Sequence, residues 1–371
     1  MKNQSPVLFA VLLACVGAAQ AQSSSVTIFG VMDASLRSSN GQGATGKDRA
    51  NMVLSGGLAP SRWGIRVVED LGDGLKALAY LDSRFQLDTG TLDAGATWQQ
   101  SWVGIESPKF GRLTAGRDYN VLFDITATTF AAFLPVGPFI NSYKPEVALA
   151  LGSRNDNQLK YRIGGTQWVG ALQVSAPEGG TFSPTFGKSY GGTFKYNFGP
   201  VSAGVGFLER EDNASRKARA YLAGAAYRQG DLYLNAVWAQ NRFDDGLNAA
   251  LMLVGSGAEN TVVGSQAGQL STRVNRRDLI TFGGTYGLTP FWTVGAQYWN
   301  LKQSFHTPGA PDGKGDFMAA LVDYRLSKRT DLYGAIEYTT LDAMQLTDTT
   351  TGTPNGATNR TAFMAGIRHV F

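Results

Sequence analysis

The final stretch of the chain, residues 360–371, alternates between two kinds of side chain with a period of two. One face carries Arg368 among small and apolar residues, whereas the other is mostly apolar and ends in the rings of His369 and Phe371. Such alternation predicts a β-strand with one apolar face. A strand that ends on an aromatic ring is typical of a transmembrane β-barrel, in which rings form girdles at both membrane interfaces.

The same alternation recurs in three segments of the N-terminal part, residues 26–37, 61–66 and 75–85. One face is polar and comprises Asp33, Ser35, Arg37, Arg62, Arg66, Lys76, Tyr80, Asp82 and Arg84. The opposite face comprises Ile28, Ala34, Leu36, Trp63, Ile65, Ala77, Ala79, Leu81 and Phe85. In a barrel with a wet lumen, the first set faces inward and the second faces lipid. A soluble β-sandwich also alternates, so these segments alone leave both architectures open.

Turn-forming residues divide the chain into a regular series of strands. Short clusters of Gly, Pro, Asn and Asp, which favour tight turns, occur at 70–74, 108–111, 164–167, 197–200, 228–231, 287–290 and 327–330. Longer polar segments lie near 38–50, 88–96, 120–156, 177–188, 210–217, 243–274, 303–315 and 343–359. Seven short turns and eight long loops connect sixteen strands. The sequence therefore predicts an all-β fold, a 16-stranded antiparallel transmembrane β-barrel with both termini on the short-turn side.

The first 21 residues have the pattern of a secretory signal peptide. Lys2 precedes an apolar run from Val7 to Val16, and small residues precede a predicted cleavage site after Ala21. Cleavage there leaves residues 22–371 as one barrel domain. Cys15, the one cysteine of the chain, lies in this leader, so the mature chain would have neither a disulfide nor a cysteine metal site. The sequence around Cys15 also approximates a lipoprotein cleavage site, an alternative that would retain this residue.

Composition narrows the class of protein further. The 46 Gly, 20 Phe, 14 Tyr and 7 Trp suit strands, turns and interfacial rings. After the leader no stretch approaches the ~18 apolar residues of a membrane-spanning helix, which excludes a helical membrane protein. The formal net charge is +4, but Lys and Arg are scattered along the predicted strands and do not form the basic cluster of a nucleic-acid binder. We therefore expect these side chains to line a pore, with no nucleic-acid partner.

Five segments spread over the chain resemble the signature segments of the general porins of β-proteobacteria. They are residues 25–33, 61–77, 110–119, 326–334 and 366–371, and they follow one another in the order of the family. The resemblance implies a homotrimer of sixteen-stranded barrels in the bacterial outer membrane, in contact with lipid and lipopolysaccharide. Each barrel would be a water-filled channel for passive diffusion of small hydrophilic solutes, narrowed by an inward-folded third loop. Outward-facing Ala77 and Ala79 would permit the close barrel-to-barrel packing of a trimer.

The third long loop, residues 120–156, is the candidate constriction, because selectivity in a wide barrel depends on the charges at its narrowest point. Residues 130–140 are too apolar to extend into water, so we expect them to pack against the inner wall. The candidate constriction residues are Arg62, Arg66, Lys76, Arg84, Gln100, Arg117, Asp124, Glu146, Arg154 and Lys160. Acids of the loop, which also include Asp156, would face the bases across the pore, and the basic excess favours anions.

Two of these arginines have additional support. Arg154 begins a segment that resembles the one by which the family leaves its third loop, and Arg117 directly precedes this loop. Gln100, in contrast, stands where anion-selective members of the family often carry arginine. We therefore predict a mild anion preference. Gln100 could instead bind a polar organic solute together with Trp102 and Tyr80, which leaves a substrate-specific channel as the alternative.

Other patterns point to no reaction. Residues 41–46 satisfy GxGxxG, but no helix or βαβ unit follows, so a dinucleotide site is not expected. His306 and His369 are the two histidines, and their positions offer no metal-ligand spacing and no catalytic partner. Outer-membrane proteases and lipases are barrels too, so a barrel enzyme and a barrel adhesin remain alternatives. We predict a channel with no enzymatic activity, no metal and no cofactor.

Overall fold

The computed structural model of the protein describes residues 24–92, 97–137, 150–177, 188–247, 274–344, 346, 348 and 355–371. The predicted signal peptide, residues 1–21, and Glu146 lie outside the described residues. No helix in this part of the chain has both the length and the apolar character needed to cross a membrane.

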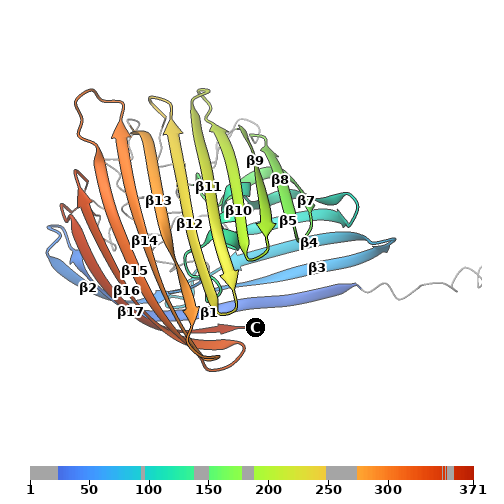
Figure 1. Ribbon diagram of the computed structural model, residues 1–371, viewed down its shortest axis with the longest axis horizontal. Coiled ribbons are helices and arrows are strands. Elements are labelled where there is room, and N and C mark those ends of the chain that lie inside the picture. Colours follow the sequence, from blue (N-terminus) through green and yellow to red (C-terminus); the bar gives the residue numbers. More distant parts are fainter. Residues whose placement is uncertain are drawn as a thin grey trace, which may run out of the picture.

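The described residues form one antiparallel sheet that closes on itself (Figure 1). Its strands are β1 (Ser25–Gln42), β2 (Asp48–Ser55), β3 (Arg62–Gly72), β4 (Leu75–Arg84), β5 (Gln100–Ser107), β6 (Gly111–Tyr119), β7 (Arg154–Gly164), β8 (Trp168–Ser175), β9 (Lys188–Phe198), β10 (Val201–Glu211), β11 (Lys217–Gln229), β12 (Leu232–Phe243), β13 (Val274–Gly287), β14 (Trp292–Phe305), β15 (Gly313–Arg325), β16 (Thr330–Asp342) and β17 (Asn359–Val370). Neighbours in the chain are neighbours in the wall, which is the up-and-down order that the turn pattern predicts.

The second wall strand is divided into two pieces. Both β2 and β3 pair with the same edge of β1, β2 with residues 34–42 and β3 with residues 25–31. A break at residues 56–61 separates the two pieces. Counted as wall strands, the seventeen segments therefore make sixteen, and the predicted 16-stranded barrel is confirmed. The first long loop is shorter than predicted, because pairing between β1 and β2 extends from Ala34 to Gln42.

The barrel closes between its first and last strands. Residues 31–39 of β1 pair with residues 362–370 of β17. Beyond this ladder, Gly30 and Phe371 exchange two backbone hydrogen bonds, with N···O distances of 3.0 and 3.1 Å. A Cβ atom on Gly30 would lie 2.2 Å from Cζ of Phe371, so the absence of a side chain there makes room for the terminal ring.

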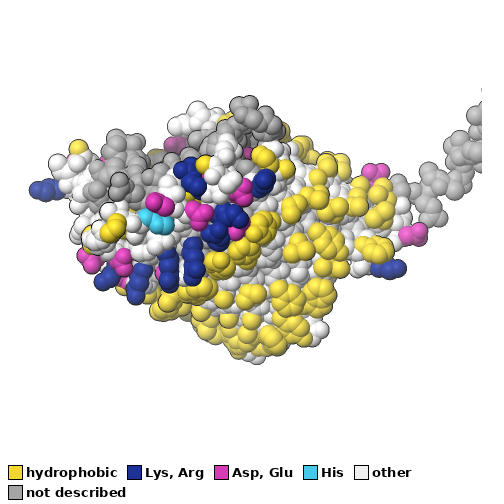
Figure 2. Space-filling model, turned by 90° about the horizontal axis from the view of Figure 1, so that it is seen from above, with side chains coloured by type: hydrophobic (Ala, Val, Ile, Leu, Met, Phe, Trp, Pro, Cys, Tyr) yellow, Lys and Arg dark blue, Asp and Glu magenta, His cyan; other side chains and the backbone are white. Residues whose placement is uncertain are grey.

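The two faces of the wall differ as the sequence predicts. On β17, Ala362 and Met364 are buried on the lumen side, whereas Phe363 and Ile367 are about half exposed on the outside, at 52% and 48%. Figure 2 shows apolar side chains as a broad band over the outer wall, with most charged side chains gathered apart from it. Rings near the short turns contact one another in pairs, such as Trp292 with Tyr324, whose centroids are 4.5 Å apart. These are the features of a lipid-facing wall with an aromatic girdle.

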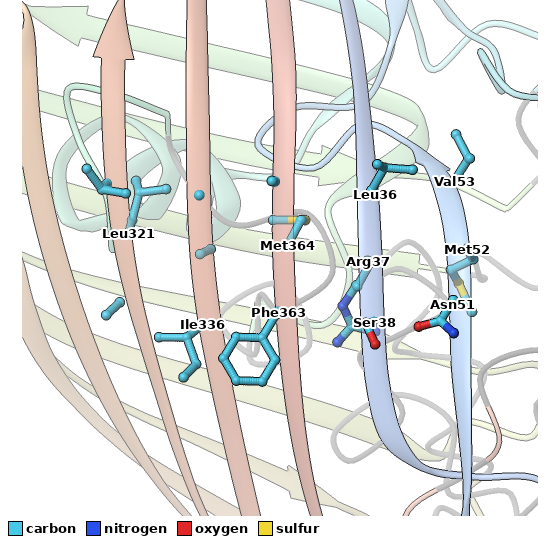
Figure 3. A pocket seen from close by; sticks show the side chains of 15 residues that line it. Leu36, Arg37, Ser38, Asn51, Met52, Val53, Leu321, Ile336, Phe363 and Met364 are labelled. Carbon is cyan, nitrogen blue, oxygen red and sulfur yellow. The ribbon is translucent and has the colours of Figure 1, made fainter.

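An apolar hollow of about 820 Å³ lies on the outer wall, over β1, β2, β15, β16 and β17 (Figure 3). We call it the outer hollow. Small residues of the outer face line it, and they are Ala320, Gly334 and Ala365. Leu36, Ile336 and Phe363 stand around it. Because Ala320, Gly334 and Ala365 have small side chains or none, the surface is concave here, whereas large apolar groups cover the wall around it.

The break in the second wall strand is held by the buried carboxylate of Asp33. Its two oxygens accept hydrogen bonds from the backbone N–H groups of Gly57, Leu58 and Ala59, at 2.9–3.0 Å. The hydroxyl of Tyr333 on β16 donates a further hydrogen bond to Asp33, at 2.5 Å. Because Asp33 faces the lumen, the segment 56–61 turns toward the inside of the barrel, and Leu58 is almost fully buried there.

Replacing Asp33 by Ala should destabilise the barrel, because three buried N–H groups and one hydroxyl lose their acceptor. We expect the free energy of unfolding to fall by about 3 kcal/mol, measured by urea unfolding of the refolded protein in detergent with tryptophan fluorescence. Asp70→Ala is the matched control, since the Asp70 carboxylate is exposed and accepts one local N–H, from Gly72. Equal stability of the two variants would contradict the role given to Asp33.

Candidate pore constriction

The third loop folds into the barrel and crosses its inside. It begins with α2 (Val121–Ile125) and the π-helical turn η2 (Thr126–Phe130). The first contacts β8, β9 and β10, and the second contacts β11 and β12, so the loop follows the inner wall (Figure 1). Phe133 then reaches Trp299 on β14, with ring centroids 6.5 Å apart. The predicted inward fold is confirmed, as is the predicted packing of the apolar segment for residues 130–137.

Three glycines of the wall leave room for the apolar side chains of this loop. A Cβ atom on Gly206 would lie 2.4 Å from Leu122, and one on Gly204 would lie 2.8 Å from Ile125. Gly224 faces the ring of Phe130 in the same way, where a Cβ atom would lie 3.0 Å from the ring. A larger residue at any of these positions would displace the loop. The path of the loop therefore depends on glycines in the wall strands β10 and β11.

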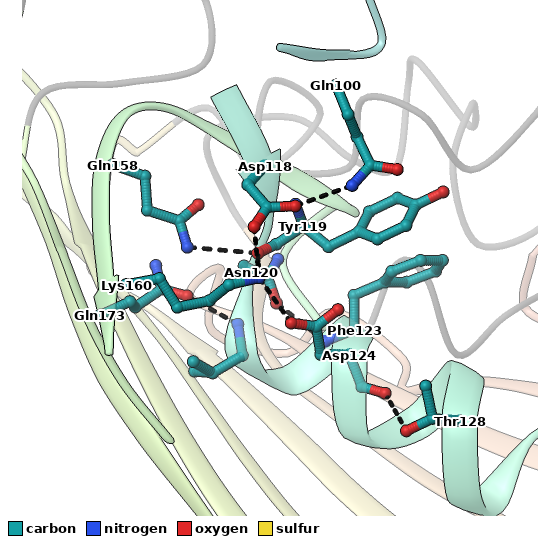
Figure 4. Close-up of polar contacts among 11 residues, drawn as sticks. Gln100, Asp118, Tyr119, Asn120, Phe123, Asp124, Thr128, Gln158, Lys160 and Gln173 are labelled. Atoms are coloured by element: carbon teal, nitrogen blue, oxygen red, sulfur yellow. Dashed lines mark hydrogen bonds and ion pairs between the residues drawn. The ribbon is translucent and has the colours of Figure 1, made fainter. Parts of the chain in front are cut away.

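A charged network fastens the start of the loop to the wall (Figure 4). Nζ of Lys160 on β7 lies 2.7 Å from a carboxylate oxygen of Asp118 and 2.6 Å from one of Asp124. Gln100 on β5 donates to the other oxygen of Asp118, at 2.7 Å. Burial raises the pKa of the Asp124 carboxyl, and the Lys160 ammonium opposes this shift. Lys160 and Asp124, predicted as pore-lining residues, are therefore paired with each other, and Gln100, also predicted, is linked to them through Asp118.

Asn120 ties the two ends of the loop together. Its side-chain oxygen accepts a hydrogen bond from the N–H of Phe123 and caps α2. Its side-chain nitrogen donates to the carbonyl groups of Ala150 and Gly152, at 3.0 and 2.7 Å. Asn120 is fully buried. The loop therefore leaves and rejoins the wall at a single fixed point, which positions the residues on both sides of it.

Three arginines gather around one tyrosine beside this point. The guanidinium groups of Arg84 and Arg154 each donate to the hydroxyl of Tyr119, at 3.3 and 3.4 Å. Arg154 also lies over the ring of Tyr119, 4.8 Å from its centroid. Arg62 completes the group, with Nε 3.6 Å from the carboxylate of Asp82. We call Arg62, Arg84 and Arg154 the arginine cluster.

The arginine cluster carries a positive excess. Among the described residues, a carboxylate lies within ion-pair distance of Arg62 alone of the three, that of Asp82, whereas Arg84 and Arg154 contact the neutral hydroxyl of Tyr119, which leaves two positive charges. Arg62 and Arg84 retain partial exposure, so the charge is accessible from the lumen. These guanidinium groups attract an anion in the narrow pore more strongly than they would in bulk water, because the low-dielectric walls focus the electric field.

The other predicted constriction residues lie apart from this cluster. Arg117 forms an ion pair with Asp156. Lys76 is exposed near a short turn, opposite Glu106 in the strand register. Arg66 lies closer to the short-turn end of β3 and lines a separate hollow with Tyr80. Of the ten predicted residues, the structure thus brings three into the arginine cluster. It brings three more, Gln100, Asp124 and Lys160, into the charged network that fastens the start of the loop.

Some residues of this region were missed from sequence. Asp118 and Tyr119 lie at the centre of the two networks, and their place directly before the loop was a signal that could have identified them. A further hollow of about 190 Å³ beside α2 is lined by Arg112, Arg162 and Lys195, none of which was predicted. Among the described residues, no three His, Cys, Asp or Glu side chains form a group that could hold a metal ion.

A closed sixteen-stranded wall with an apolar outside, a polar inside and an inward loop defines the class of outer-membrane diffusion channels. Residues 9–343 match the family described as Gram-negative porin, and the chain belongs to this family. Outer membrane porin protein 32 of Delftia acidovorans is 26% identical over 376 residues, with 97% of each chain covered. The protein is therefore a porin of the bacterial outer membrane.

Solved structures show the same fold. The anion-selective porin from Comamonas acidovorans superimposes with a TM-score of 0.69 and 22% identity, covering 94% of this chain and all of that one. OmpT of Vibrio cholerae in its trimer form has a TM-score of 0.66 and 15% identity, covering 94% and 99%. Family and fold together indicate a channel and not an enzyme.

Replacing Lys160 by Met should loosen the third loop, because the buried carboxylate of Asp118 and the partly exposed one of Asp124 lose their counter-ion. We expect the free energy of unfolding to fall by about 3 kcal/mol and single-channel recordings to show more current noise in the open state. Lys188→Met, at the exposed start of β9, is the control. If both variants recorded like the unmodified channel, the Lys160 network would not be the anchor of the loop.

Proposed function

We propose that this diffusion channel passes small hydrophilic solutes and ions with a preference for anions. The observation that supports the preference is the arginine cluster beside the inward loop, in which one of the three guanidinium groups lies near a described carboxylate and two contact the hydroxyl of Tyr119. Among the described acids of the third loop and its start, Asp118 and Asp124 pair with Lys160, and Asp156 pairs with Arg117. A solute that passes this point therefore meets more uncompensated positive than negative charge.

The preference we propose is mild. Asp82 offsets part of the charge of Arg62, and Gln100 contributes none. The similar structure from Comamonas acidovorans is described as anion-selective, which agrees in direction with this proposal. No chemical step, cofactor or energy source is part of it, because diffusion through a water-filled pore needs none.

Removing the charge of Arg84 or Arg154 should move selectivity toward cations. We expect each Ala variant to lower the anion-to-cation permeability ratio by about three-fold at 0.1 M KCl, as judged from the reversal potential across planar bilayers. The shift should shrink at 1 M KCl, where the screening length is only ~3 Å. Gln100→Arg adds a positive charge and should move the reversal potential the opposite way.

Arg325→Ala is the matched control for these measurements, because Arg325 is exposed beside a short turn, away from the arginine cluster. It removes the same charge and should leave the reversal potential almost unchanged. A channel with strong cation selectivity, or cluster variants with the selectivity of the control, would refute the proposed constriction.

We further propose that three copies associate through the apolar outer wall, which elsewhere contacts lipid and lipopolysaccharide. A ring of three needs two different contact faces on each copy. The outer hollow on β15, β16 and β17 is suited to one, and the small side chains of Ala77 and Ala79 on β4 are suited to the other. The trimer form of the similar OmpT agrees with this arrangement.

Filling the outer hollow should weaken the trimer. We expect Ala365→Trp to convert the heat-resistant oligomer of unboiled gels into a monomer, and to lower the mass measured by light scattering in detergent. Leu172→Trp is the control, because Leu172 lies on β8 on the outer wall and is 63% exposed. A monomeric unmodified protein would contradict the proposed assembly. An intact Ala365→Trp trimer would show that the outer hollow is not part of the interface.

A further inference from the structure

Three aromatic rings form a continuous row on the inner wall below the arginine cluster. The rings of Phe29 on β1 and Tyr80 on β4 stack with centroids 5.3 Å apart and an angle of 27°. Tyr80 then stacks on Trp102 of β5, with centroids 5.5 Å apart and an angle of 9°. All three side chains are only partly buried. We call this row the aromatic shelf.

The wall is shaped to let this row form. Gly64 on β3 lies between Phe29 and Asp82 in the strand register. A Cβ atom on Gly64 would lie 2.4 Å from the ring of Phe29, so the ring crosses β3 only because this position has no side chain. Phe29 thereby reaches Tyr80, which lies beyond β3 on the next strand. The row is therefore a built feature of the wall that spans four strands.

A hollow of about 490 Å³ adjoins the shelf. Phe29 and Tyr80 form its aromatic side, and Ser25, Thr27 and Arg66 add polar groups. Its volume falls within the range of about 300–1,000 Å³ that is usual for sites of small organic ligands. Among the described residues, no carboxylate pairs with the Arg66 guanidinium, whereas Arg37, Arg62, Arg117 and Arg368 each have a carboxylate partner.

Arg62 and Arg66 lie on the same face of β3, four residues apart, with Gly64 between them. The ring of Phe29 crosses the strand at Gly64, so one arginine stands on each side of the shelf. An anionic solute that leaves the arginine cluster would meet the edges of these stacked rings next and then the guanidinium of Arg66. A flat ring with one carboxylate matches this sequence of groups, because the face of an aromatic ring packs favourably on the edges of other rings and guanidinium binds carboxylate bidentately.

We propose that the aromatic shelf and Arg66 form a weak binding site for aromatic carboxylates on their way through the pore. The face of the solute ring packs against the edges of Phe29 and Tyr80, which line the hollow, and its carboxylate meets Arg66. The hydroxyls of Ser25 and Thr27 are placed to bind a ring substituent or the carboxylate. The proposed site rests on the proposed anion preference, since the solute first passes the arginine cluster. The residues of the site are nevertheless different from those of the cluster.

The test uses benzoate as the probe and the KCl current through the refolded, full-length mature channel in planar bilayers as the readout. Benzoate should reduce the current in a saturable manner. Cyclohexanecarboxylate has the same charge and a similar size but no aromatic face, and it should bind about five-fold more weakly. Equal block by both acids, or a benzoate effect that does not saturate, would overturn the proposal.

Variants separate the two halves of the site. Tyr80→Leu should weaken the block by benzoate about five-fold and leave that by cyclohexanecarboxylate nearly unchanged, whereas Tyr80→Phe should retain the benzoate block. Arg66→Gln should weaken the block by both acids. Phe198→Leu, an exchange on the outer wall at a side chain that is 60% exposed, is the control. Unchanged benzoate affinity in Tyr80→Leu and Arg66→Gln would overturn the site.

A failure of the site and a failure of the anion preference give different results. If the channel prefers chloride over potassium but benzoate produces no saturable block, the site is wrong and the proposed function stands. If the reversal potential shows no anion preference, the proposed function is wrong, and the benzoate titration still decides the site by itself. Should Tyr80→Leu not fold, Phe29→Leu tests the other ring that lines the hollow, with the same expected loss.

Discussion

The closure of the wall between β1 and β17 is the interaction on which the rest of the structure depends. Inside a membrane there is no water to bind unpaired backbone groups, so a sheet can span it only when no edge remains open. Here β1 pairs with β17 along one edge and with both β2 and β3 along the other. The exchange of hydrogen bonds between Gly30 and Phe371 completes this ring at the end of the chain.

A closed barrel of sixteen strands leaves a lumen, and the third loop determines its shape. The loop lies where the wall lacks side chains, at Gly204, Gly206 and Gly224, and it is fastened where Lys160 meets two carboxylates. Apolar packing fixes the path, and the buried charges fix its starting point. The same anchor explains why the acids nearest the constriction do not cancel the arginine cluster.

Basic residues that look equivalent in sequence have different roles in the lumen. Lys160 is buried and paired with two acids, Arg117 is paired with one, and Arg66 has no acidic partner among the described residues. Arg84 and Arg154 share the hydroxyl of Tyr119. The field in the pore therefore depends on the pairing of each cation and not on the number of Lys and Arg along the strands.

The sequence by itself determined the strands, their number, the polar and apolar faces and the apolar contact of the third loop, because these follow from short-range alternation and from local turn residues. Only the tertiary structure decided the break at 56–61, the convergence of Arg84 and Arg154 on Tyr119, and the stacking of Phe29 on Tyr80. Each of these joins residues from separate strands, and its geometry depends on strand register and on glycines such as Gly64 in a third strand. Alternation along one strand reveals which side chains face the lumen, but closure of the barrel decides which of them meet.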